Sequence, residues 1–360
     1  MDRQPKNAIA AYILQEDLQP DLSDEIKVSL GVSRGAEFEV RVPKTIAIPV
    51  KKYDWIKKYS LQHMLGQKDS SVEDMLFVPS DVVERWGLQE GDMVWFRPKE
   101  GLSSIFNVNG FEDPQALRKR PRLIKDISAH YAEKRIPIES VKLPGPEKEG
   151  APNGNVSNRL LTILAPVPQG GRLIIASPPA AGKSTVLRFV YEALLRLLEH
   201  DERLFVIALQ VGERHEDAAE LEVIRNSVPH DKTRSELFYA SKGNPKEEIL
   251  AGQYWLTKFV KARAERICEG TDEFGYNVVL LIDSMSRVMM SHSFSDKIDK
   301  PEGGGALSQG LQPQSLIDTD SLLNVAGYFK GNGKYGERSL TIIATMLKQD
   351  DINTRRRKRS

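Results

Sequence analysis

The segment Ser177–Thr185, which reads SPPAAGKST, constrains the fold of this chain more than any other feature. It stands between a short apolar run, Arg172–Ala176, and the stretch Lys183–Glu199, whose apolar residues recur at helical spacing. Small residues between a strand and a helix let backbone N–H groups turn into one concavity, which is what a bound phosphate requires. We therefore expect a phosphate-binding loop made of Ser177, Pro178, Pro179, Ala180, Ala181, Gly182, Lys183, Ser184 and Thr185.

Two residues of this loop carry specific chemistry. Lys183 is expected to reach the β- and γ-phosphates of a nucleotide, and the Ser184 hydroxyl is expected to bind Mg²⁺. The helix that follows adds the partial positive charge of its N-terminus. Glycine usually opens such a loop, and Ser177 stands in that place here. The alternative is that Gly-Lys-Ser is only the start of a helix and binds no nucleotide. A Mg²⁺ site would also need a carboxylate on a neighbouring strand.

Asp283 is the carboxylate that this hypothesis needs. It directly follows the apolar run Val279–Ile282, which places it at the carboxyl end of a buried strand. Ligand chemistry collects at that edge of open α/β sheets. The alternative is that Asp283 caps the following helix. With the phosphate loop upstream, we expect Asp283 and Ser184 to hold the metal ion.

Glu213 is the candidate base that orients the attacking water. It follows the apolar strand Leu204–Val211 and is expected to face the same edge of the sheet. An ion pair of Glu213 with Arg214 or Arg225 on the surface is the alternative. Loop, aspartate and glutamate at three strand ends together favour a site that hydrolyses a nucleotide with Mg²⁺.

The pattern of strands and helices divides the chain at a stretch rich in proline and glycine, residues 142–158, which predicts a linker. After it, apolar strands alternate with long helices such as Pro245–Cys268, which indicates an α/β fold with a mostly parallel sheet. The predicted strands include Leu204–Val211, Val278–Ile282 and Leu340–Ala344.

The part before the linker predicts a small β-rich domain, because short strand-like runs alternate with turn residues. One short helix, Ser80–Trp86, interrupts them, and Gly91 and Asp92 predict a tight turn. The predicted strands are Glu25–Leu30, Phe38–Val42, Thr45–Val50, Met75–Val78 and Met93–Arg97.

Composition narrows the class of protein further. A length of 360 residues suggests about two domains at roughly 150 residues each. Lys+Arg 51 against Asp+Glu 50 leaves a net charge of +1, which excludes a histone-like chain but leaves local basic surfaces possible. The single Cys268 supplies neither an internal disulfide nor a zinc cluster. Without a signal-peptide pattern or a membrane-spanning run, we expect a cytoplasmic protein.

Several motifs, in the same order, resemble the bacterial transcription termination factor Rho family, whose members are ring-forming, RNA-dependent ATPases with a RecA-like motor. The resemblance spans roughly residues 74–347. Ser339–Met346, which reads SLTIIATM, and the double proline before Gly-Lys-Ser separate it from other phosphate-loop families. The further matching stretches are Met75–Ser80, Glu90–Asp92, Arg97–Gly101, Ala129–Glu139, Gly212–Arg214 and Val279–Arg287.

The resemblance implies a RecA-like P-loop NTPase core preceded by an OB-fold or cold-shock-like domain. It implies that Lys183, Glu213 and Asp283 are catalytic, with Arg214 and Arg287 as supporting or interface arginines. The segment Pro301–Gly310 corresponds to the family's channel loop, and a plain surface insertion is the alternative. The RNA contacts implied there are Lys297, Lys300, Gly303, Gly304 and Gly305.

This sequence departs from the family pattern at several places. The family carries a lysine where Ala180 stands and a basic segment where Ile317–Ser321 is acidic. It also continues well beyond its SLTIIAT strand with a region that holds an arginine finger, which we expect this chain to lack. An arginine finger is worth about 10³–10⁵ in rate in GTPases, so turnover is in doubt.

The N-terminal part lacks the family's aromatic RNA-binding signature. Tyr53, Trp55 and Tyr59 among lysines are candidates for base stacking, and a solvated amphipathic segment is the alternative. The basic clusters Arg118–Lys125 and Arg355–Arg359 are either RNA contacts or plain solubilising surface.

We therefore expect four parts: a β-rich, RNA-binding domain at 1–110, a connector at 111–157, a RecA-like ATPase domain at 158–347 and a basic tail at 348–360. The expected function is that of an RNA-stimulated ATPase and translocase in transcription termination, with ATP and Mg²⁺ as cofactors. Its expected partners are single-stranded RNA, other subunits of a ring and RNA polymerase. The alternatives are a weakly catalytic subunit that joins or inhibits a full-length ring, and a RecA-like motor acting on other cargo.

Overall fold

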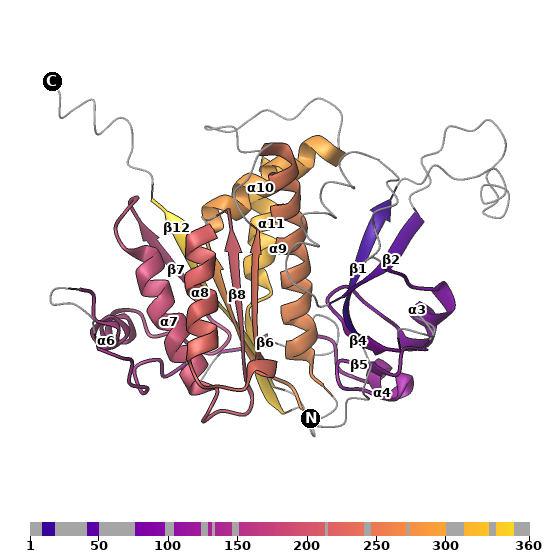
Figure 1. The fold of residues 1–360 in the computed structure, drawn as a ribbon, viewed down its shortest axis with the longest axis horizontal. Coiled ribbons are helices and arrows are strands. Elements are labelled where there is room, and N and C mark those ends of the chain that lie inside the picture. Colours follow the sequence, from indigo (N-terminus) through magenta and orange to yellow (C-terminus); the bar gives the residue numbers. More distant parts are fainter. Residues whose placement is uncertain are drawn as a thin grey trace. The chain divides into compact units, whose positions relative to one another are not determined.

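The computed structural model describes residues 9–18, 42–49, 76–97, 104–123, 129–131, 134–145, 151–212, 215–240, 246–271, 274–299, 313–330 and 336–348. The described elements divide into two compact units, and the boundary between them falls between Lys119 and Arg120. The first unit holds strands β1–β5 with helices α3 and α4, and the second holds the later elements (Figure 1).

The first unit is a five-stranded antiparallel sheet in the order β3-β2-β1-β4-β5, which agrees with the expected small β-rich part. Helix α3 begins after Pro79 and ends before Gly87, whose φ of +63° forms a left-handed cap that glycine adopts readily. The bounds are β1 Ile9–Leu18, β2 Val42–Pro49, β3 Leu76–Phe77, α3 Ser80–Trp86, β4 Met93–Phe96, β5 Asn107–Val108 and α4 Pro114–Arg118.

Predicted and observed strands differ in this first unit. The run Ile9–Leu18, which forms β1, was not predicted to be a strand because Gln15, Glu16 and Asp17 interrupt its apolar pattern. The predicted strand Thr45–Val50 falls on β2. Glu25–Leu30, and Phe38–Val42 up to its last residue, lie outside the described residues.

The second unit is built on a seven-stranded sheet whose core strands run parallel. Its order is β6-β11-β12-β10-β8-β9, and β7 pairs with the carboxyl half of β12. β12 therefore lies between β7 and β10, while β11 and β6 extend the sheet antiparallel. The bounds are β6 Ala129–His130, β7 Arg172–Ser177, β8 Leu204–Val211, β9 Ser235–Ala240, β10 Asn277–Asp283, β11 Gly327–Lys330 and β12 Glu337–Leu347.

Helices cover both faces of this sheet, so the second unit is a three-layer α/β/α structure. Figure 1 shows α6, α7 and α8 in front of one face and α9, α10 and α11 on the other. The bounds are α6 Gly154–Leu164, α7 Lys183–Leu197, α8 His215–Ser227, α9 Lys246–Glu269, α10 Met285–Asp299 and α11 Pro313–Asn324, with a short 3₁₀ turn, η2, at Lys232–Arg234.

The core of the second unit lies between the sheet and these helices. Every residue of β8 is buried, as expected for a parallel strand covered on both faces. On α7 the predicted apolar stripe packs inward, with Leu187, Val190 and Leu194 at most 4 % exposed. On the other face α9 contributes Phe259, whose ring meets Phe238 of β9 edge to face at 5.6 Å.

The predicted linker at 142–158 is wrong at its carboxyl end, because Gly154 already begins α6. The Asn153 side chain accepts hydrogen bonds from the backbone N–H groups of Asn155 and Val156, at 3.0 and 3.3 Å, and so caps that helix. The helix places Val156, Leu160 and Ile163 more than half exposed, whereas Leu161 packs against the core.

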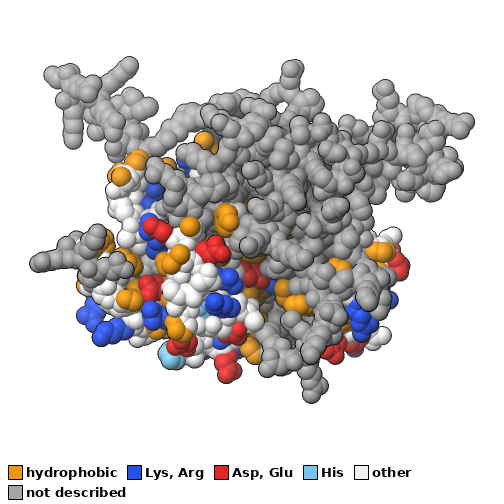
Figure 2. Space-filling model, in the orientation of Figure 1, with side chains coloured by type: hydrophobic (Ala, Val, Ile, Leu, Met, Phe, Trp, Pro, Cys, Tyr) orange, Lys and Arg blue, Asp and Glu red, His pale blue; other side chains and the backbone are white. Residues whose placement is uncertain are grey.

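On the described surface, positive and negative side chains are interspersed, which matches the nearly balanced composition (Figure 2). Within the described part of the chain, none of the helices has the length and apolar character needed to cross a membrane.

Candidate nucleotide-binding site

The predicted phosphate loop connects the end of β7 to the start of α7, as the sequence pattern indicated. Ser177 is the last residue of β7, and Lys183 is the first residue of α7. Two loop residues have left-handed backbones: Ala180 at φ +60° and Gly182 at φ +83°. Pro178, Pro179, Ala180, Ala181 and Gly182 are exposed, and Lys183, Ser184 and Thr185 are half-buried.

The start of α7 has the features of an anion-binding helix terminus. No described side chain caps it, and its first turn contains no acidic residue. A side chain at Gly182 would meet no heavy atom within 4 Å among the described residues, so the space beside its Cα is open. The exposed N–H groups and the helix dipole favour negative charge at this position. These residues therefore fit the phosphate groups of a nucleotide.

Asp283 ends β10 at the same edge of the sheet, and its side chain is only 2 % exposed. The Thr345 hydroxyl of β12 donates a hydrogen bond to Oδ1 of Asp283. In the other direction β10 pairs with β8, where Gln210 stands opposite Asp283. This carboxylate is buried at the sheet edge and held there by a neighbouring strand.

Hydrogen bonds connect the end of β12 to the end of β7 and to the start of α10, which follows β10. Lys348 N–H, just beyond β12, donates to the Ser177 carbonyl at 2.9 Å. Leu347 N–H donates to the Ser286 hydroxyl oxygen at 2.9 Å. Since β12 is the single strand between β7 and β10, the phosphate loop begins about 10 Å from the end of β10, which is two strand spacings. The structure thus brings the loop and Asp283 to one edge.

Gly212 directly follows β8 and carries the chain toward Glu213. Its φ is +68°, and a methyl group there would lie 3.0 Å from Nε2 of Gln253 on α9 and 3.2 Å from Cδ of Arg287 on α10. Arg287, which the sequence resemblance placed near the site, therefore packs its aliphatic stem against the end of β8. Gly212 is needed for both its backbone conformation and this close approach.

Several predicted site residues lie outside the described residues. These are Glu213, Arg214, Lys300, Gly303, Gly304 and Gly305. Lys297 belongs to α10, but its side chain is also outside the described set. Of the residues that flank Glu213 and Arg214, Gly212 directly follows β8 and His215 begins α8.

Sequence reasoning gave no role to Thr345 and Ser286, which contact Asp283 and the end of β12. A signal was present, because Thr341 and Thr345 interrupt the apolar run Leu340–Met346 of β12, and both are fully buried. Thr341 accepts a hydrogen bond from Gly170 N–H at 2.8 Å. A buried hydroxyl must find such a partner, but the sequence does not say which one.

Comparison with known proteins is consistent with this geometry. Residues 158–355 match the model of the ATP synthase alpha/beta family, nucleotide-binding domain, which is more than half of the chain. Transcription termination factor Rho of Streptobacillus moniliformis is 29 % identical over 76 % of this chain and 57 % of its own length. The Rho protein of Aquifex aeolicus is 29 % identical over 97 % of this chain and 78 % of its own.

One solved structure comes from a study of a prototypical ATPase from the type III secretion system of pathogenic bacteria. It is 20 % identical with a TM-score of 0.40, over 54 % of this chain and 48 % of that chain. The matches span about three fifths of the first two curated relatives, at 57 % and 61 % of their lengths. With its phosphate loop and its buried aspartate on one edge of a RecA-like α/β sheet, this chain belongs to the ATP synthase alpha/beta family of nucleotide-binding domains, and the curated relatives that it resembles are transcription termination factors Rho.

Proposed function

We propose that this chain is a Mg²⁺-dependent ATPase of the Rho type, stimulated by single-stranded RNA and acting in the cytoplasm in transcription termination. The observation that carries the proposal is the meeting of the phosphate loop and Asp283 on either side of β12. The names of the curated relatives add the connection to termination.

In this proposal each residue has a separate task. Backbone N–H groups of the loop and the start of α7 hold the β- and γ-phosphates, and Lys183 neutralises their charge. The hydroxyl of Ser184 and the carboxylate of Asp283 hold Mg²⁺, which would stabilise the charge that develops on the phosphate oxygens. Glu213 accepts a proton from the attacking water and orients it toward the terminal phosphate.

The proposal extends to RNA and to an oligomeric ring, because these properties belong to the Rho resemblance of the sequence. Lys297, Lys300 and the glycines at 303–305 are the proposed RNA contacts, and Arg214 and Arg287 are the proposed supporting arginines. A ring of like subunits would place one subunit's arginines beside the next subunit's nucleotide. RNA polymerase and a full-length homologue are further proposed partners.

The test is ATP hydrolysis by the purified chain with and without single-stranded RNA. Lys183→Ala is the blank, and Lys232→Ala, at an exposed lysine of η2, is the matched control. We expect RNA to raise turnover, the blank to abolish it and the control to leave it unchanged. Glu213→Ala should bind ATP but turn it over at least about 10²-fold more slowly, in the range typical of general-base loss.

Each negative result would contradict a different part of the proposed function. Turnover that survives Lys183→Ala would remove the loop from the mechanism. ATP binding without turnover under any condition would instead favour the non-catalytic subunit of a mixed ring. Turnover that does not respond to RNA would leave an ATPase acting on another cargo.

A further inference from the structure

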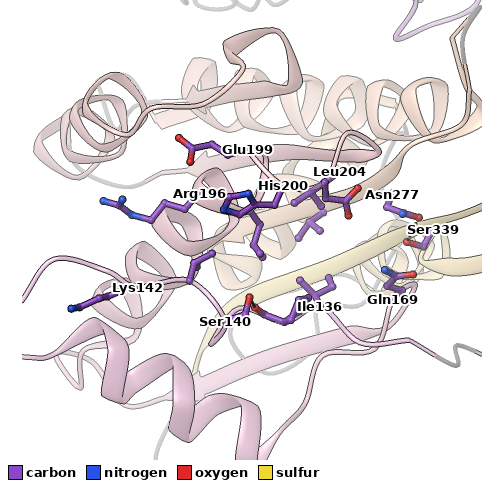
Figure 3. A pocket seen from close by; sticks show the side chains of 15 residues that line it. Ile136, Ser140, Lys142, Gln169, Arg196, Glu199, His200, Leu204, Asn277 and Ser339 are labelled. Atoms are coloured by element: carbon purple, nitrogen blue, oxygen red, sulfur yellow. Dashed lines mark hydrogen bonds between the residues drawn. The ribbon is translucent and has the colours of Figure 1, made fainter.

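A cavity of about 490 Å³ lies at the edge of the sheet opposite the phosphate loop. It is bounded by the amino-terminal ends of β8 and β10, the start of β12, the last turn of α7 and residues 136–142 (Figure 3). Because β8 is 8 residues long, this edge is roughly 25 Å from the carboxyl ends that hold the nucleotide site. The cavity is therefore a separate site.

Apolar side chains form part of the lining of this cavity, beside polar and charged ones. Leu197, Leu204 and Val279 line it from α7 and the sheet, and they are 7 %, 4 % and 1 % exposed. Ile136 lines it from the facing segment, where its backbone N–H donates to the Val167 carbonyl at 2.9 Å. A volume of this size with apolar walls is typical of small-molecule sites. An apolar part of a ligand would pack against these side chains.

One end of the cavity is lined by polar side chains that can form hydrogen bonds with a ligand. Figure 3 shows Asn277, Ser339 and Gln169 gathered there. The Ser339 hydroxyl donates to Oδ1 of Asn277 at 3.1 Å, which fixes the Asn277 amide and leaves its Nδ2 as a donor. The Gln169 side chain makes no hydrogen bond to a described residue, while its backbone N–H is held by the Lys134 carbonyl at 2.9 Å. Two amides thus supply donors and acceptors.

The charges around the cavity do not favour an anion. Besides His200, the lining holds two basic residues, Lys142 and Arg196, and two acidic ones, Glu199 and Asp201. Arg196 already pairs with Glu192 of its own helix at 2.9 Å. The C-terminus of α7 also points at the cavity, and the negative end of a helix dipole opposes a phosphate. The ligand that fits these charges is uncharged.

We propose that this cavity binds an uncharged nucleoside, with its base between the apolar walls and the base edge at the amides of Gln169 and Asn277. A nucleobase is a flat ring whose edge carries adjacent donors and acceptors, which two side-chain amides match. Because the proposed ligand carries no phosphate, this site differs from the phosphate loop in the kind of ligand that it binds.

The test is calorimetric titration of the full chain carrying Lys183→Ala, so that binding at the phosphate loop does not contribute. Adenosine, guanosine, cytidine and uridine are the probes, and the monophosphate of the tightest binder is the comparison. Gln169→Met removes an amide that makes no hydrogen bond to another described residue, and Gln115→Met, on α4, is the matched control. Ser140→Trp, at an exposed rim position, fills the cavity by a second route.

We expect at least one nucleoside to bind saturably, with its monophosphate weaker. Gln169→Met should weaken binding about tenfold, the effect of one lost hydrogen bond, and Gln115→Met should not change it. Ser140→Trp should abolish binding with the melting temperature retained. Three results would each overturn the proposal: no binding by any of the four nucleosides, unchanged affinity in both cavity variants, or tighter binding of the monophosphate.

Discussion

At the scale of single residues, the contact that matters most for the proposed site is the one between Thr345 and Asp283. A carboxylate that is 2 % exposed needs hydrogen-bond partners in place of water, and the Thr345 hydroxyl provides one. Because β12 stands between the phosphate loop and β10, the same strand that fixes the carboxylate also contacts Ser177. Thr345 is therefore a positioning residue for the proposed metal ligand.

Thr345→Val keeps the shape of the side chain but removes this hydrogen bond. We expect unfolding free energy to fall by about 1.5–3 kcal/mol, the range for a bond to a charged group, and turnover to require more Mg²⁺. The measurement is the Mg²⁺ dependence of ATP hydrolysis together with urea denaturation.

Two further substitutions isolate the effect. Thr341→Val, on the same strand, loses a buried hydrogen bond with Gly170 and should lower stability without moving the Mg²⁺ dependence. Thr345→Ser retains the hydroxyl and should restore that dependence. If Thr345→Val titrates with Mg²⁺ as the wild type does, Thr345 has only a structural role.

Gly212 is the second residue whose replacement has a predictable cost. An alanine at φ +68° is strained, and its methyl group would press on Gln253 and Arg287. We expect Gly212→Ala to lower the unfolding free energy by about 1–3 kcal/mol, measured by urea denaturation. Gly145→Ala is the matched control, because a methyl group there meets no heavy atom of a described residue within 4 Å. Equal stability of the two variants would contradict this account.

At the scale of elements, the sequence predicted best those strands that the fold buries on both faces. The predicted strand Leu204–Val211 has the same bounds as β8, because an uninterrupted apolar run of that length has few alternatives. Predicted Leu340–Ala344 is the middle of β12, whose buried Arg338, Ser339 and Thr345 hide its true extent. The position of a polar residue in a buried strand can be explained only by the residues that it contacts in the folded chain, and these are not visible in the sequence.

Sequence patterns predicted which elements carry three of the proposed site residues, but not the strand order that relates these elements. The strand and helix signals around Gly-Lys-Ser placed Lys183 and Ser184, and an apolar run placed Asp283. The order of strands depends on long-range pairing, so no local pattern indicated that β12 lies between β7 and β10. The cavity at the opposite edge was not predicted for the same reason, since its walls come from five separate segments.

The connection between α8 and β9 contains His230, whose protonation should make the stability of the fold depend on pH. His230 Nδ1 lies 2.8 Å from the Val228 carbonyl, and its Nε2 lies 2.9 Å from the Ser235 hydroxyl. Burial, with the charges of Arg225 and Lys232, lowers the pKa of His230 below its ordinary 6.5, against the opposing effect of the Val228 hydrogen bond. The folded chain therefore favours the neutral imidazole.

The lowered pKa of His230 determines in which direction the unfolding free energy changes with pH. Between the folded pKa and about 6.5 the unfolded chain binds a proton at His230 that the folded chain does not, so stability falls as pH falls. His230→Gln should remove that contribution and give a shallower slope of unfolding free energy between about pH 7 and about pH 5. Urea denaturation across this range is the measurement. Parallel slopes for the two proteins would show that His230 does not titrate differently on folding.

At the scale of the whole molecule, Glu269 joins parts of the second unit that are far apart in sequence. Its carboxylate is 1 % exposed and pairs with Arg266 at 2.8 Å, Arg122 at 3.1 Å and Arg120 at 3.5 Å. Its backbone carbonyl accepts from Arg338 of β12 at 2.9 Å. The start of the second unit, the end of α9 and the sheet thus meet at one buried acid.

Glu269→Gln keeps the shape of this residue but leaves the buried arginines short of a compensating charge. Breaking a buried ion pair from one side costs about 3–5 kcal/mol, so we expect the second unit to open far more often. The adjacent Cys268 reports that opening, because it is the single cysteine, is fully buried and has its thiol pKa raised by burial. Thiol labelling should accelerate by roughly 10²–10³-fold. Glu202→Gln, at an exposed acid, is the control.

The same variant tests whether the two compact units unfold separately. Each unit has its own sheet, and the ion pairs of Glu269 given above are with residues of the second unit. Hydrogen exchange of Glu269→Gln should therefore show lost protection in β10 and β12, with β4 of the first unit as protected as in the wild type. If protection falls in β4 to the same extent, the two units unfold as one cooperative body, and a change at Glu269 reaches the β-rich unit as well as the proposed nucleotide site.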